Sequence, residues 1–134
     1  MTLFSLSDVS YDVPGRRLID TLSLEITEGA VTALVGRNGS GKSTLLKLIA
    51  GQNRPASGRI AHADRPLADW PPRELARRIA YLPQVTPVAE GIRLAELVAL
   101  GRYPWRGALG RFRAEDHAAV TEAMQRCGLR PLAD

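Results

Sequence analysis

The sequence predicts an α/β protein with a mainly parallel core sheet and an antiparallel β segment at its N-terminus. Two segments near the N-terminus alternate polar and apolar residues with the period of two that half-buried strands show. They are followed by a run with little polar alternation, residues 30–35, which leads into a glycine-rich turn and then an apolar helix. Strand, glycine-rich turn and helix in this order are typical of sheets that bind a ligand at the carboxyl end of a strand.

The N-terminal segments predict an antiparallel pair. A strand is expected over residues 3–13, and the turn residues Pro14-Gly15 end it. A second alternating segment, residues 22–27, ends at Glu28-Gly29. The next strand, residues 30–35, has the continuous apolar character of a strand buried on both faces of a parallel sheet.

The turn after this strand has the pattern of a phosphate-binding loop. It reads Gly36-Arg37-Asn38-Gly39-Ser40-Gly41-Lys42-Ser43-Thr44, which fits G-x-x-x-x-G-K-[ST] at each fixed position. Small residues at 39–41 let successive backbone N–H groups point at one anion. Lys42 adds a positive charge for the outer phosphates, the Ser43 hydroxyl is placed to ligate Mg²⁺, and Thr44 is either a second such hydroxyl or an ordinary first-turn residue. The predicted ligand is a nucleoside triphosphate with magnesium.

Further elements follow the loop in order. A helix over 43–50 carries leucines around most of its circumference and is expected to be buried on all sides. A turn at 55–58 leads into a short strand at 59–61, and a short helix is expected from Trp70 to Arg78. Residues 79–82 predict a second core strand, which Pro83 stops, and Gln84 follows directly.

The last third of the chain is predicted to be helical on both sides of an irregular stretch. Leu94, Leu97 and Val98 form a helical stripe, whereas residues 102–113 have no periodicity. A final helix is expected over 114–127, with Cys127 on its apolar face.

Composition limits the function classes. The chain of 134 residues has 18 basic and 14 acidic residues and a net charge of +4, which is too small a balance to indicate nucleic acid by itself. The single Cys127 excludes an internal disulfide and indicates a reducing compartment, the cytoplasm. No apolar run approaches the roughly 20 residues that span a bilayer. His62 and His117 are isolated in the sequence and are expected at the surface.

Three features together resemble the ATP-binding subunit of ABC transporters: Tyr11 on the N-terminal sheet, the loop at 36–44, and Gln84 after a core strand. The resemblance implies a P-loop NTPase core in which Tyr11 stacks on adenine, Lys42 and Gln84 act in catalysis, and Ser43 and Gln84 ligate magnesium. It also implies ATP and Mg²⁺ as cofactors and a head-to-tail pair of copies. Such a pair would work with a transmembrane permease on the inner face of the cell membrane, and indirectly with a periplasmic or surface substrate-binding protein.

Two stretches are similar to one branch of that family. The resemblance is to the branch that energises uptake of ferric siderophores, haem or cobalamin. It lies in Tyr81-Leu82-Pro83-Gln84 and in Glu96-Leu97-Val98-Ala99-Leu100-Gly101-Arg102-Tyr103-Pro104. Arg102-Tyr103-Pro104-Trp105 and Gly110-Arg111-Phe112 are most similar to the ferric hydroxamate importers. Residues 102–113 are then expected to dock on the permease, with a plain loop and a nucleic-acid patch as the other interpretations.

The family pattern is only partly present. The chain contains no Leu-Ser-Gly-Gly-Gln-like signature, no apolar run ending in Asp-Glu and no switch histidine. In the family these follow a helix like 114–127, so we expect residues 1–134 to be the N-terminal part of a single ATP-binding domain, truncated before the signature. Such a chain is expected to bind nucleotide and hydrolyse almost none.

Two other functions compete with transport. An ABC-type ATPase that acts on ribosomes or DNA would have a similar loop, but it requires a basic binding surface or an inserted arm, and nothing longer than 102–113 offers one. A small-molecule kinase also begins with a phosphate loop, but the antiparallel segment before Gly36 argues against it. No nucleic-acid partner is expected.

Overall fold

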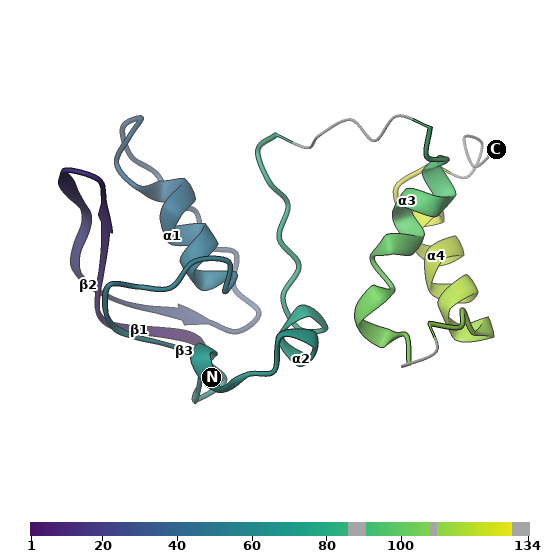
Figure 1. The fold of residues 1–134 in the computed structure, drawn as a ribbon, viewed down its shortest axis with the longest axis horizontal. Coiled ribbons are helices and arrows are strands. Elements are labelled where there is room, and N and C mark those ends of the chain that lie inside the picture. Colours follow the sequence, from purple (N-terminus) through teal and green to yellow (C-terminus); the bar gives the residue numbers. More distant parts are fainter. Residues whose placement is uncertain (86–90, 108–109, 130–134) are drawn as a thin grey trace. The chain divides into compact units, whose positions relative to one another are not determined.

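The structure is a computed structural model that describes residues 1–85, 91–107 and 110–129. The chain forms two compact units, Met1–Tyr81 and Leu82–Asp134. Figure 1 follows the elements along the chain. The phosphate-loop sequence belongs to the first unit, and Gln84 belongs to the second.

The first unit contains a four-stranded antiparallel sheet. Its strands are β1 (Thr2–Val13), β2 (Arg16–Thr27), β3 (Ser57–His62) and β4 (Arg65–Pro66), in the order β2-β1-β3-β4. The predicted antiparallel pair at the N-terminus is confirmed, and its alternation places one side of each strand against the core.

The helix α1 (Lys42–Ile49) packs on this sheet. Leu45 and Leu48 join the buried cluster; its sheet members are Phe4, Leu6, Val9, Ile19 and Ile60. Leu46 on the other side of the helix is 48% exposed. The expectation that α1 is buried all round is therefore wrong, because the described sheet covers only one face of it.

Two predicted strands are not formed in the structure. Residues 30–35 and 79–82 have no strand assignment, and Val31 and Val35 are 101% and 86% exposed. A strand is stable only where neighbouring strands take up its backbone N–H and C=O groups. Each strand of the described sheet pairs within β1 to β4, so neither segment finds a partner in the described part of the chain.

His62 is buried, contrary to the expectation of a surface histidine. It is 6% exposed, and its ring stacks between Phe4 at 4.8 Å and Trp70 at 5.7 Å between centroids. The reason is the register of the sheet, which sets His62 on β3 opposite Phe4 on β1. Trp70 follows the short helix η1 (Leu67–Asp69) and precedes α2 (Pro72–Ala76).

The second unit packs α3 (Leu94–Leu100) against α4 (Ala114–Arg126), with η2 (Tyr103–Trp105) between them along the chain. The helices α3 and α4 confirm the predicted ones, whereas η2 lies in the stretch predicted to be irregular. Cys127 follows the last residue of α4 and is exposed, so its expected place on the apolar face is wrong. No helix in residues 1–85, 91–107 and 110–129 has the length and apolar character needed to cross a bilayer.

One ion pair connects the irregular stretch to α4. Arg102 Nε donates to Asp116 Oδ1 at 2.8 Å, and the Arg113 backbone N–H donates to Asp116 Oδ2 at 3.0 Å. Asp116 is only 3% exposed. The hydrogen bond from Arg113 first, and that from Arg102 next, lower the pKa of this carboxyl below its ordinary value of 3.8.

We expect Asp116→Asn to lower the melting temperature of the second unit at neutral pH, because the two donors then face a neutral amide. A carboxyl group whose pKa is lowered by folding contributes its full stabilising free energy above its unfolded-state pKa. That contribution is lost as the pH falls through the folded-state pKa. The difference in melting temperature between wild type and variant should therefore shrink below pH 3.8. Glu115→Gln, at an exposed carboxylate in the same helical turn, is the control. A difference that is constant across this range would contradict the assignment.

Gly58 allows the close approach of β3 to β1. A Cβ at Gly58 would lie 2.3 Å from the Asp8 carbonyl oxygen, and φ is +82°. Gly15 has a similar φ of +81° with no heavy atom within 4 Å of the added Cβ. Gly15→Ala should therefore cost about 1–2 kcal/mol of unfolding free energy from backbone strain alone. Gly58→Ala should cost a further ~1–3 kcal/mol from the clash. Equal losses in urea unfolding would rule out the close approach.

Candidate functional site

The phosphate-loop sequence lies at the start of α1 in the first unit. Gly41 is the N-cap residue of α1 and has φ 92°, and Gly39 has φ 79°, both in the left-handed region that favours glycine. Leu45 N donates to Gly41 O at 2.8 Å, which begins the helical hydrogen bonds. The N–H groups of Lys42, Ser43 and Thr44 precede this bond and have no acceptor within the helix. They and the helix dipole favour an anion at this end.

The Lys42 side chain folds back onto the start of the loop. Its Nζ donates to the carbonyl oxygens of Gly36 at 2.9 Å and Arg37 at 2.8 Å, and Ser40 N donates to Arg37 O at 3.2 Å. A Cβ at Gly36 would lie 3.0 Å from Ser40 Oγ, so the two ends of the loop are close together. The ammonium group is thereby held at the loop, and Lys42 as a residue is only half-buried.

The hydroxyl side chains after Lys42 suit magnesium chemically. Ser43 is exposed and Thr44 is half-buried, both in the first turn of α1. Mg²⁺ prefers oxygen ligands and usually takes only one or two from protein, with phosphate oxygens and water for the rest. A single hydroxyl beside bound phosphates fits that preference. Among the described residues, no group of three or more His, Cys, Asp or Glu side chains is arranged so that it could hold a metal ion.

Tyr11 lies on β1 in the same unit as the loop. Its ring is half-buried against the core cluster, and its hydroxyl accepts a hydrogen bond from Asn53 Nδ2 at 3.2 Å. Tyr11 pairs with Ile19 across the strands, and Ile19 lies beside Gly41. The structure thus connects Tyr11 to the loop through one side chain. Adenine stacking on Tyr11 stays a prediction.

Gln84 belongs to the second unit and is exposed after Pro83. The structure does not bring it together with Lys42 or Ser43 in one described unit. Its predicted contact with magnesium and water therefore stays a prediction.

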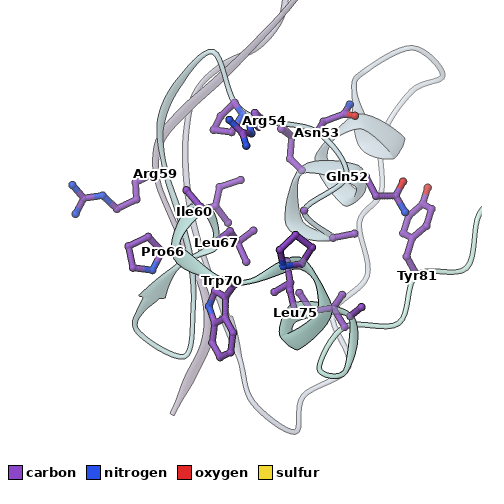
Figure 2. A pocket seen from close by; sticks show the side chains of 18 of the residues that line it. Gln52, Asn53, Arg54, Arg59, Ile60, Pro66, Leu67, Trp70, Leu75 and Tyr81 are labelled. Atoms are coloured by element: carbon purple, nitrogen blue, oxygen red, sulfur yellow. The ribbon is translucent and has the colours of Figure 1, made fainter. Parts of the chain in front are cut away.

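A pocket of about 690 Å³ opens at the other end of α1. Its walls are mainly apolar, and Figure 2 shows Ile60 and Leu67 facing into it while Arg59 points away. The lining includes Ala50 and Gly51, which follow α1, so the pocket lies at the negative end of the helix dipole. That end disfavours a triphosphate, and the pocket is not the predicted nucleotide site.

The arginine and aromatic stretch of the second unit is held by cation–π contacts. The Arg102 guanidinium lies 4.4 Å from the Trp105 ring centroid, and that of Arg106 lies 4.8 Å from Phe112. Tyr103 and Trp105 are nevertheless 68% and 40% exposed. Residues 108 and 109 of this stretch lie outside the described residues.

Sequence reasoning missed Leu18 and Ile19, which lie on β2 beside Gly41 of the loop. An alanine Cβ at Gly41 would lie 3.4 Å from both Ile19 Cγ1 and the Leu18 carbonyl oxygen. The one signal in the sequence is that two adjacent apolar residues interrupt the alternation expected of β2.

Comparison with known proteins places this geometry in a family. The family described as ABC transporter matches residues 19–134. A hemin import ATP-binding protein of Gloeobacter violaceus is 41% identical over 98% of this chain and 47% of its own length. A ferric enterobactin transport ATP-binding protein of Escherichia coli is 42% identical over 86% of this chain and 42% of its own length.

The fold is similar to a solved ATP-binding subunit of an ABC transporter. The TM-score is 0.78 at 28% identity, covering 99% of this chain and 54% of that one. The P-loop fold class predicted from the sequence is thus confirmed. The chain spans about half the length of the curated relatives that it matches.

Proposed function

Because the chain belongs to the ABC transporter family, we propose that it is the N-terminal portion of the ATP-binding subunit of an importer of iron-siderophore or haem complexes. The observation that carries the proposal is the geometry at the start of α1. Gly41 has a left-handed conformation there, and the N–H groups that follow it have no acceptor within the helix and lie next to the Lys42 side chain. The names of the relatives support the class of cargo. Which complex is carried depends on partner proteins.

The loop would bind ATP through its backbone and Lys42. Phosphate oxygens would replace the Gly36 and Arg37 carbonyls as acceptors of Lys42 Nζ, so the ammonium charge would offset charge that develops on the γ-phosphoryl group. Bound magnesium would supply charge neutralisation between the outer phosphates. Ser43 and Gln84 would hold it, and Gln84 would also orient the attacking water.

The partners follow from the family. A transmembrane permease would contact residues 102–113, where Tyr103 and Trp105 are exposed, and the Gln84 segment. A second copy would complete each ATP site head to tail, and a periplasmic or surface binding protein would act on the permease. We place the protein in the cytoplasm, peripheral on the inner face of the membrane.

The ATP site is tested by Lys42→Ala. A charge-assisted hydrogen bond contributes about 1.5–3 kcal/mol, so ATP affinity by calorimetry should fall about ten- to hundredfold. Lys47→Ala removes an exposed lysine from the last turn of the same helix and should leave affinity unchanged. Equal affinities for the two variants would refute the assignment of Lys42.

The adenine site is tested separately with Tyr11. Stacking of a base on an aromatic ring contributes roughly 1–3 kcal/mol, so Tyr11→Ala should weaken ATP binding while leaving inorganic tripolyphosphate binding unchanged. Tyr11→Phe keeps the ring, loses only the bond from Asn53, and serves as the control. Loss of both ligands in Tyr11→Ala would indicate a structural role instead.

The transport assignment is tested by what the tagged protein retains from cells. Copurification of a polytopic permease supports the importer. Copurification of RNA without a permease would support the alternative ATPase that acts on ribosomes or DNA.

A further inference from the structure

Gly41 is buried against β2, although most of the loop around it is exposed. A methyl group at its Cα would lie 3.4 Å from Ile19 Cγ1, 3.4 Å from the Leu18 carbonyl oxygen and 3.5 Å from Leu18 Cγ. Leu18 and Ile19 are therefore the nearest residues beside the α-carbon of Gly41, at about the distance that one methyl group would fill, where α1 begins.

The side chain of Ile19 is held in place by the hydrophobic core. It is 8% exposed and belongs to the same buried cluster as Leu45, the first buried residue of α1. Interiors of this kind are close-packed, so a side chain held in one has little freedom to move. The Ile19 side chain that lies beside Gly41 is therefore well fixed.

Arg17 forms two ion pairs next to residues 18 and 19 of β2. Its Nε donates to Asp12 Oδ1 at 3.0 Å, and its Nη1 donates to Asp20 Oδ1 at 3.3 Å. Asp12 lies on β1 and Asp20 follows Ile19 on β2. The groups are half-exposed, so the bonds add little free energy, but they link both strands around residues 18 and 19.

We propose that Leu18 and Ile19 are positioning residues for phosphate binding and act through Gly41. The direction of the N–H groups of Lys42 and Ser43 depends on the φ and ψ of Gly41, and glycine has the widest choice of these angles of any residue. Gly41 has a left-handed φ of 92°, and residues 18 and 19 on one side limit how far its α-carbon can move toward β2. The inference rests on the proposed function, since it specifies how the ATP site is held ready.

The test compares Ile19→Ala with Ile26→Ala. Both remove the same atoms from one strand and the same core, but Ile26 pairs with Phe4 at the far end of β2. Inorganic tripolyphosphate is the probe, because it lacks the base that Tyr11 would contact. Since a misdirected N–H group would lose one hydrogen bond to the charged phosphate, Ile19→Ala should weaken tripolyphosphate binding on the order of tenfold. Ile26→Ala should bind as wild type does. Equal binding by both variants, measured where both are folded, overturns the proposal.

A second measurement does not depend on a ligand. The Leu45 amide donates to Gly41 O, so its hydrogen exchange reports whether Gly41 is held in place. Ile19→Ala should accelerate this exchange relative to the β1 amides, and Ile26→Ala should not. Unchanged relative exchange overturns the proposal. Failure of the wild-type chain to bind tripolyphosphate or ATP would instead refute the proposed function. If Ile19→Ala does not fold, the pair Ile19→Val and Ile26→Val gives the same comparison.

Discussion

The geometry of the candidate site depends on one residue in a left-handed conformation. Gly41, at φ 92°, joins an exposed loop to a helix whose buried face is part of the core. Its carbonyl begins the helix, and a Cβ added to its α-carbon would lie at van der Waals distance, 3.4 Å, from Ile19 Cγ1. A residue with a side chain would therefore introduce backbone strain at this positive φ. The anion-binding end of α1 therefore exists because the loop can turn at this point.

The features predictable from the sequence are those determined by local pattern. The alternation in β1 and β2 was sufficient for the hairpin, and the fixed positions from Gly36 to Ser43 were sufficient for the loop and the helix after it. Each depends on residues near one another in the chain. The contact of Leu18 and Ile19 with Gly41 joins positions more than twenty residues apart, and no local pattern specifies it.

The incorrect predictions share a cause. A sequence pattern indicates whether a residue suits a buried or an exposed environment, but it does not identify the neighbouring residues that provide that environment. Residues 30–35 have the apolar character of a strand, but a strand also needs paired backbone groups. His62 is polar and isolated in sequence, yet the sheet register stacks it on Phe4. The leucines of α1 suggested burial on all sides, whereas Leu46 faces away from the one sheet that covers the helix. Each outcome was decided by tertiary contacts.

The division of the chain separates two kinds of chemistry. The loop, Tyr11 and the Leu18–Ile19 contact all lie within Met1–Tyr81, whereas Gln84 and the arginine and aromatic stretch lie within Leu82–Asp134. Binding of a phosphate chain needs only fixed N–H groups and a charge, which the first unit holds by itself. In the proposed function, orienting water and contacting a partner would fall to residues of the second unit. The groups proposed to bind the triphosphate thus lie in one unit, and those proposed to couple binding to transport lie in the other.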